Sequence, residues 1–184
     1  MLAQRSAATR AISTARQRPN PHLHRADMIA TALCGDVRIC VVRCSQLALE
    51  AQRRWDWSDQ GRTQRWGTHA AFANMYSAFL SPGERVKATL QLPGEELFAE
   101  AISVGEVRGY SRKSSSPELA AGPSLLLLDR IRYGLRQAHH TSVASCGDIR
   151  RTWQRFYDES EQISTFTCAF SPATATWLMQ SVSV

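Results

Sequence analysis

The chain has 184 residues, of which 43% are hydrophobic, and it carries a formal net charge of +6. This length suffices for one domain with a real core, and the apolar content is that of a folded protein rather than a disordered one. The longest apolar run of note, residues 125–128, is far shorter than the ~20 residues that cross a bilayer, so the sequence predicts no membrane span.

The positive charge is concentrated at the N-terminus. Residues 1–26 contain five arginines and no acidic residue, which leaves 17 basic and 16 acidic residues in the remainder. The near-neutral remainder does not favour a surface that follows nucleic-acid phosphates. A segment rich in arginine, alanine and serine and free of acidic residues is typical of a mitochondrial or, less often, a plastid presequence. The alternative is a basic tail able to contact RNA. We therefore expect a domain boundary near Asp27 and a location in the mitochondrial matrix.

The first structured elements are expected between residues 27 and 80. Residues 27–33 suggest a short helix or lead-in, residues 35–36 a turn, and the β-branched stretch 37–44 a strand. Ser45 is a candidate cap for a helix over residues 46–55. A longer helix is expected from residue 58 or 59 to about residue 80, where Ser-Pro-Gly ends it.

Two tryptophans, Trp55 and Trp57, flank Asp56 at the break between these helices. Large aromatic side chains between elements are either a local cap over the core or a partly exposed binding surface. We take Trp55 and Trp57 as the candidate partner-binding residues, with at least one of them expected to be partly exposed.

Residues 84–110 predict an antiparallel meander. Alternate residues of the stretch 84–92, Val86, Ala88 and Leu90, face one side of a half-buried strand. Pro-Gly and Gly-Glu turns then separate further strands over residues 97–104 and 107–110.

The second half of the chain adds strands around one helix. Residues 111–122 form a polar loop that is the internal candidate for mobility, followed by expected strands at 125–128 and 133–144. Strands at 166–170 and 174–184 close the chain. Strands and helices that do not alternate regularly indicate an α+β domain with an antiparallel sheet core, spanning residues 27–184.

The most informative stretch is residues 147–165. Gly147 and Asp148 start a helix, because an aspartate at this position accepts hydrogen bonds from free backbone N–H groups. Its apolar stripe consists of Ile149, Trp153, Phe156 and Tyr157. The tripeptide Ser160, Glu161 and Gln162 follows, and a Gly-x-x-Arg-Gly-Tyr segment ending in Arg108, Gly109 and Tyr110 lies upstream.

These two motifs, in this order and spacing, resemble the core domain of the heat-shock protein 33 family of redox-regulated holdase chaperones. The resemblance implies a single α+β domain that binds unfolding proteins through apolar surface without ATP. It also implies structural roles for the eight motif residues. From the residue types themselves, we expect Arg108 to pair with a carboxylate inside the fold rather than to act in catalysis. Nucleophile-elbow, phosphate-loop and dinucleotide-binding motifs are missing, so we expect no catalytic residues and no enzyme activity.

Metal and cofactor sites are not expected. The five cysteines, Cys34, Cys40, Cys44, Cys146 and Cys168, are odd in number and irregularly spaced, which indicates reduced thiols on strands or in the core. Cys40 and Cys44 on one strand would lie about 13 Å apart, whereas two thiolates of one zinc ion lie within ~4 Å. The histidines, including His69 on its helix, are also taken as non-ligands. The resemblance implies a zinc switch held by Cys-x-Cys and Cys-x-x-Cys, and these 184 residues contain neither pair.

Two functions remain open from the sequence. One is a holdase without the redox switch, which binds unfolded client proteins. The other is a non-enzymatic structural or assembly subunit of a mitochondrial complex such as the mitoribosome, whose fixed neighbours cover the apolar surface and whose arginine-rich tail touches RNA.

Overall fold

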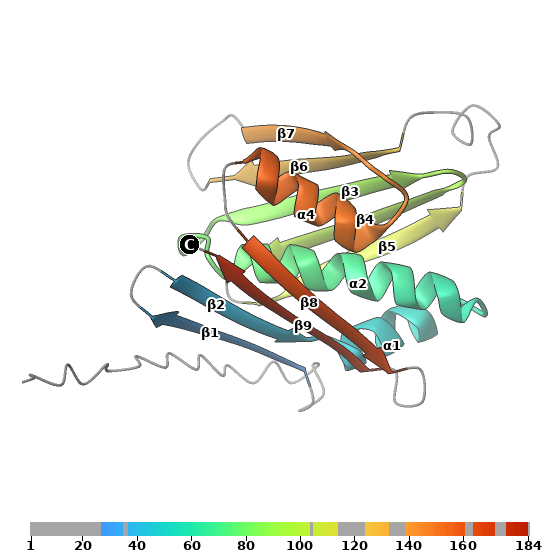
Figure 1. Ribbon diagram of the computed structural model, residues 1–184. Coiled ribbons are helices and arrows are strands. Elements are labelled where there is room, and N and C mark those ends of the chain that lie inside the picture. The colour runs from blue at the N-terminus through green and yellow to red at the C-terminus, as the bar shows by residue number, and fades with distance from the viewer. Residues whose placement is uncertain are drawn as a thin grey trace, which may run out of the picture.

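The computed structural model describes residues 27–34, 37–103, 105–113, 124–132, 139–160, 164–171 and 176–183, the last two ranges by their backbone path only. Two antiparallel sheets enclose a long helix (Figure 1). Their strands are β1 (Met28–Cys34), β2 (Val37–Arg43), β3 (Arg85–Leu92), β4 (Glu95–Ile102), β5 (Val107–Lys113), β6 (Leu125–Ile131), β7 (His139–Ala144), β8 (Ser164–Ser171) and β9 (Thr176–Ser183). The helices are α1 (Ser45–Arg54), α2 (Gln60–Ser77) and α4 (Ile149–Glu159).

The strand order is β1-β2-β9-β8 in one sheet and β5-β4-β3-β6-β7 in the other. All neighbouring strands are antiparallel, and the β3–β4–β5 part is the meander expected from the sequence. The architecture is therefore α+β, as predicted. None of the described helices is both long and apolar enough to cross a membrane.

Helix α2 lies between the two sheets (Figure 1) and contacts β3, β4 and β5 on one side and β2 and β9 on the other. Because it is covered from both sides, its buried residues extend around the helix rather than along one stripe, and include Trp66, His69, Phe72 and Met75. Trp153 of α4 stacks on Phe72 with ring centroids 5.4 Å apart, which fixes α4 on the same core.

Three sequence predictions are wrong in this part of the fold. Residues 28–34 are a strand rather than a short helix or lead-in, because each of them pairs with a residue of β2. Ser111 to Lys113 belong to β5 rather than to a loop; Ser111 is buried and its hydroxyl donates to Glu95 Oε1 at 2.7 Å. Ser45 is the first residue of α1, and its side chain does not cap the helix.

Helix α1 is capped instead from a distant part of the chain. The Asp27 carboxylate accepts hydrogen bonds from the backbone N–H groups of Gln46 at 2.9 Å and Leu47 at 2.7 Å. Burial raises the pKa of Asp27, and the two N–H donors oppose that shift. Asp27 therefore ties the start of β1 to the start of α1.

Several predicted features lie outside the described residues. These are the presequence over residues 1–26, the turn at 35–36, loop positions 114–122, strand positions 104, 133–138, 174, 175 and 184, and Glu161 and Gln162. The strand predicted over 133–144 is described from His139 onward. The helix predicted from residue 58 or 59 begins at Gln60, with Asp59 as its N-cap residue, and ends at Ser77.

Candidate functional site

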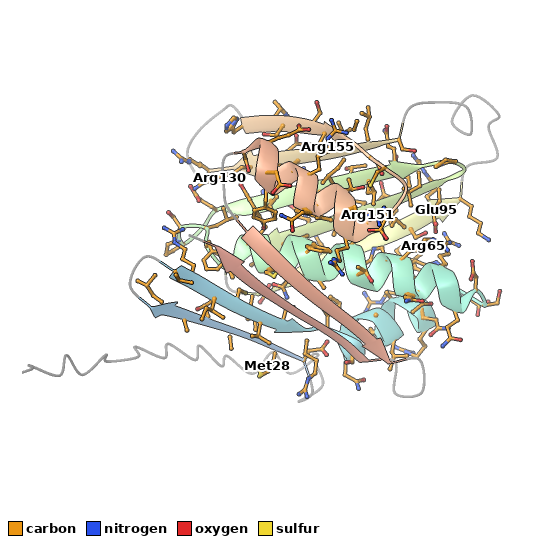
Figure 2. The ribbon with its side chains drawn as sticks, in the orientation of Figure 1. Met28, Arg65, Glu95, Arg130, Arg151 and Arg155 are labelled. Atoms are coloured by element: carbon orange, nitrogen blue, oxygen red, sulfur yellow. The ribbon has the colours of Figure 1, made fainter. Side chains whose placement is uncertain are left out.

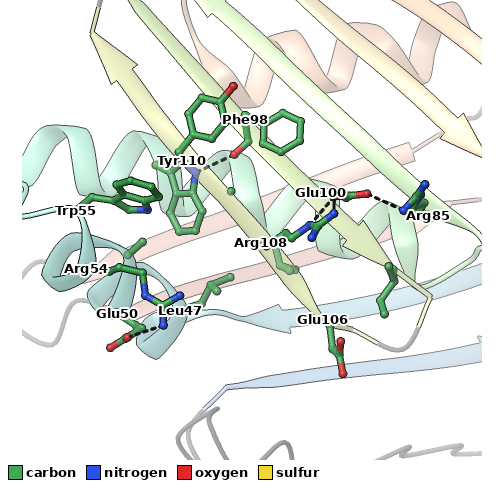
Figure 3. A pocket seen from close by; sticks show the side chains of 15 residues that line it. Leu47, Glu50, Arg54, Trp55, Arg85, Phe98, Glu100, Glu106, Arg108 and Tyr110 are labelled. Atoms are coloured by element: carbon green, nitrogen blue, oxygen red, sulfur yellow. Dashed lines mark hydrogen bonds and ion pairs between the residues drawn. The ribbon is translucent and has the colours of Figure 1, made fainter.

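A groove of about 710 Å³ lies between α1 and the β4–β5 hairpin (Figure 3). Leu47, Ala51 and Trp55 line it from the α1 side, and Phe98, Val107 and Tyr110 line it from the sheet side. Charged side chains on its borders include Glu50, Arg54 and Glu106. A concave surface with apolar walls and charged borders is typical of a site that takes an apolar ligand or peptide side chain.

The two candidate partner-binding tryptophans have different surroundings. Trp55 follows the last residue of α1 and is 53% exposed at the groove, whereas Trp57 is only 5% exposed. The Trp57 ring packs edge-on against Trp66, with centroids 5.8 Å apart, and the Arg62 guanidinium lies 4.9 Å from the ring centroid. Trp57 is thus the cap over the core that was the alternative interpretation, and Trp55 is the surface residue.

The Arg-Gly-Tyr motif forms part of the groove wall. A Cβ on Gly109 would lie 2.0 Å from the Phe98 carbonyl oxygen, so only glycine lets β5 approach β4 at this point. That same oxygen accepts a hydrogen bond of 3.0 Å from the indole N–H of Trp66. The Tyr110 ring stacks on Phe98 with centroids 5.2 Å apart, and its hydroxyl donates to Glu96 at 3.2 Å. The motif therefore positions the aromatic wall of the groove.

Arg108 pairs with a carboxylate, as expected from the residue types, but not inside the fold. Its side chain is 77% exposed, and its guanidinium lies 2.5 Å from Glu100, whose side chain is 4% exposed. Arg85 lies 3.4 Å from the other carboxylate oxygen of Glu100 (Figure 3). A buried carboxylate needs such compensation, and the two arginines supply it from the surface.

The groove adjoins the beginning of β1. Asp27, which precedes β1, bonds to Leu47 of the groove. On the hairpin side, a Cβ on Gly105 would lie 3.0 Å from Ile29 Cγ2, so Ile29 packs closely against the β4–β5 turn. Gly105 has a φ of +86°, which favours glycine at this turn. The edge of the four-stranded sheet and the groove are consequently neighbours.

The second motif does not belong to this groove. Asp148 accepts a hydrogen bond of 2.7 Å from the Arg151 N–H, which confirms it as the N-cap residue of α4, and Gly147 before it has a φ of +83°. The predicted stripe Ile149, Trp153, Phe156 and Tyr157 is buried. Ser160 ends the helix, and its hydroxyl donates to the Tyr157 carbonyl at 3.0 Å. The two motifs that carry the family resemblance therefore lie in separate parts of the fold.

A family model for Hsp33 proteins matches residues 28–174, which is most of the described chain and includes both motifs. This protein belongs to the Hsp33 family. A search of solved structures finds the crystal structure of the 33 kDa chaperonin (heat shock protein 33 homolog) of Thermotoga maritima, with a TM-score of 0.68 and 21% sequence identity. The match covers 85% of this chain and 61% of that one, so the chain spans less than two thirds of the Thermotoga protein. No curated protein sequence matches.

The cysteines of this Hsp33-family chain differ in exposure. Cys40 and Cys44 are buried, and burial raises the pKa of Cys40 to about 12 and that of Cys44 also well above its usual value. Cys44 precedes α1 rather than lying on β2. Cys146 is exposed, so the expectation that all thiols are shielded is wrong for this residue. Within the described part of the chain, no three His, Cys, Asp or Glu side chains come together as a metal site.

Sequence reasoning missed most of what builds the groove. Asp27, Glu100 and Phe98 carried no signal of their own, because their roles depend on partners that are distant in sequence or on neighbouring strands. Arg108, Gly109 and Tyr110 were found because a family motif contains them, and Trp55 because its break between helices was recognisable.

Proposed function

We propose that this chain is an ATP-independent holdase domain that binds unfolded protein, and that the groove beside Trp55 is a contact surface for its clients. Membership of the Hsp33 family supports the chaperone class. The observation that carries the site is a large, half-exposed indole at the border of an apolar groove. Such a surface accepts apolar side chains of many shapes and does not select one sequence.

The expected gain from this contact follows from the exposed area. A tryptophan buries about 200 Å² when fully covered, so a half-exposed one offers about 100 Å². At about 25 cal/mol per Å², covering Trp55 contributes on the order of 2.5 kcal/mol before the entropic cost of association. Glu50, Arg54 and Glu106 border the groove, so the free protein keeps charged groups beside this apolar surface.

The test is suppression of light scattering from a thermally unfolding client protein at stoichiometric amounts of the chain. Trp55→Ala should weaken suppression several-fold, whereas His139→Ala, at an exposed position on β7, should leave it unchanged. Equal suppression by Trp55→Ala and by the unchanged protein would show that the groove is not a contact surface for clients. No suppression by the unchanged protein would remove the holdase function itself.

We further propose that these residues bind clients without a thiol–zinc switch, because residues 1–184 contain neither Cys-x-Cys nor Cys-x-x-Cys. Client suppression should then be the same before and after peroxide treatment. Cys146→Ser provides the control, since the thiol of Cys146 is exposed. A strong rise in suppression after oxidation, reversed by a reductant, would contradict this part of the proposal.

A mitochondrial location is proposed from the acid-free, arginine-rich residues 1–26. A fluorescent protein fused behind residues 1–26 should enter mitochondria. A fusion that stays in the cytosol, or that enters plastids instead, would count against it.

The alternative is a non-enzymatic subunit of a mitochondrial complex such as the mitoribosome. It is favoured by three large apolar side chains that are exposed in the isolated chain, Met28, Leu33 and Trp55, which fixed neighbours would cover. In this case, the arginine-rich tail has RNA as a possible contact. Sedimentation of the native protein from a mitochondrial lysate separates the two functions: a free chain of about 20.5 kDa supports the holdase, and a large particle supports the subunit.

A further inference from the structure

β1 is an end strand of the four-stranded sheet. Among the described strands it pairs with β2 only, through all seven of its residues, so its second row of backbone N–H and C=O groups has no strand beside it. β8, at the other end of the same sheet, lies against α4 (Figure 1). A free strand edge is a template for pairing with another extended chain.

The usual protection of a sheet edge is missing from β1. Its sequence, MIATALC, contains no charged residue and no proline. By contrast β5, an end strand of the other sheet, carries Arg108, Arg112 and Lys113. Charged residues on edge strands normally prevent pairing with other chains, so the two sheets differ at their edges in this respect.

The side chains of β1 also fit an added strand. Met28 is 43% exposed and Leu33 is 58% exposed, and because they lie five residues apart they project from opposite faces of the sheet. Figure 2 shows Met28 at the border of the four-stranded sheet. A strand added beside β1 would cover both side chains. Because β1 has no charged side chain, no charge on β1 would lose its contact with water.

From these observations we infer that β1 captures extended segments of unfolding client chains by adding them as a fifth strand to its sheet. This inference rests on the proposed holdase function and gives it a second mode of contact, through the client backbone rather than its side chains. Backbone pairing is independent of client sequence. The beginning of β1 adjoins the Trp55 groove through Ile29 and Asp27, so one client chain can contact both surfaces.

A second copy of this chain is the competing occupant of the edge. Stable interfaces take about 20 to 30 residues from each partner, whereas β1 offers seven. An edge of this length, about 23 Å at 3.3 Å per residue, suits a transient extended segment rather than a stable dimer.

The probe is a fluorescein-labelled peptide of alternating threonine and valine with a lysine at each end, followed by fluorescence anisotropy with the full chain. A second peptide carries N-methyl groups on two neighbouring central residues, which interrupts hydrogen bonding on both of its edges. We expect at least tenfold weaker binding of the N-methylated peptide, and little change when threonine and valine exchange places. Equal binding of both peptides would overturn backbone pairing.

On the protein side, Leu33→Lys places a charge on the edge at an exposed position and should weaken peptide binding about tenfold. The matched control is His139→Lys, on the end strand β7 of the other sheet, which should leave binding unchanged. A chain that sediments as a dimer, and that becomes monomeric in Leu33→Lys, would assign the edge to a second copy and overturn the inference.

The two proposals fail in different ways. If the chain suppresses client aggregation and only Trp55→Ala impairs it, the holdase function stands and capture by β1 is wrong. If Leu33→Lys impairs both peptide binding and suppression while its fold is retained by circular dichroism, capture by β1 is supported. If the chain suppresses no aggregation, the proposed function fails, and the inference that rests on it fails too.

Discussion

His69 should make the stability of this protein depend on pH. The side chain is fully buried on α2 between β3 and α4, and both ring nitrogens are used. The Nε2–H donates to the Ala88 carbonyl at 3.0 Å, and Nδ1 accepts from the Trp153 indole N–H at 3.3 Å. A second proton would have to sit on Nδ1, opposite that N–H group. Only the neutral ring therefore fits the site.

The size of the effect follows from the pKa. Burial lowers the pKa of His69 from 6.5 to about 4, partly opposed by the bond to Ala88. Below pH 6.5 the His69 side chain takes up a proton in the unfolded chain but not in the folded chain. The contribution of neutral His69 to the free energy of unfolding is therefore complete above pH 6.5 and is lost as the pH falls towards 4. Over this whole interval the free energy of unfolding falls by roughly 3 kcal/mol, and between pH 8 and pH 5 it falls by about 2 kcal/mol.

Urea unfolding followed by tryptophan fluorescence at pH 8 and pH 5 measures this change. In His69→Gln, which should be less stable at pH 8, the loss between the two pH values should be smaller by about 2 kcal/mol. His139→Gln, at an exposed position on β7, is the matched control and should retain most of the loss. If the unchanged protein and His69→Gln lose the same free energy between pH 8 and pH 5, then His69 does not titrate as its burial requires.

Three further outcomes are expected. Gly109→Ala should lower the free energy of unfolding by about 3 kcal/mol, because the added Cβ meets the Phe98 carbonyl oxygen at 2.0 Å. Gly61→Ala in α2 is the control and should be neutral or stabilising. Equal melting temperatures of the two variants would contradict this prediction. Asp27→Ala should lower the free energy of unfolding, measured in urea, by about 1 kcal/mol through loss of the α1 cap. An unchanged free energy would show that Asp27 does not stabilise α1. Elemental analysis should find no stoichiometric zinc, and about one zinc per chain, lost on thiol modification, would disprove it.

The elements that the sequence determined are those whose signal lies within a few residues. The α4 cap at Asp148 bonds to an N–H three residues away, and the helix stripe repeats within one or two turns. The alternation of Val86, Ala88 and Leu90 in β3 is equally local. For such elements the backbone conformation and the buried face follow from neighbouring residues, so the α+β class could be read without the fold.

The tertiary structure decided whatever depends on segments far apart in the chain. Residues 28–34 are ambiguous alone and become a strand because β2 pairs with them, and Asp27 caps a helix that begins 18 residues later. Trp55 and Trp57 are two residues apart, yet only Trp57 meets Trp66. The groove exists because α1 and a hairpin some 50 residues further on face each other across it. Long-range pairing selects among conformations that local preferences leave nearly equal in free energy, and only the folded chain contains that information.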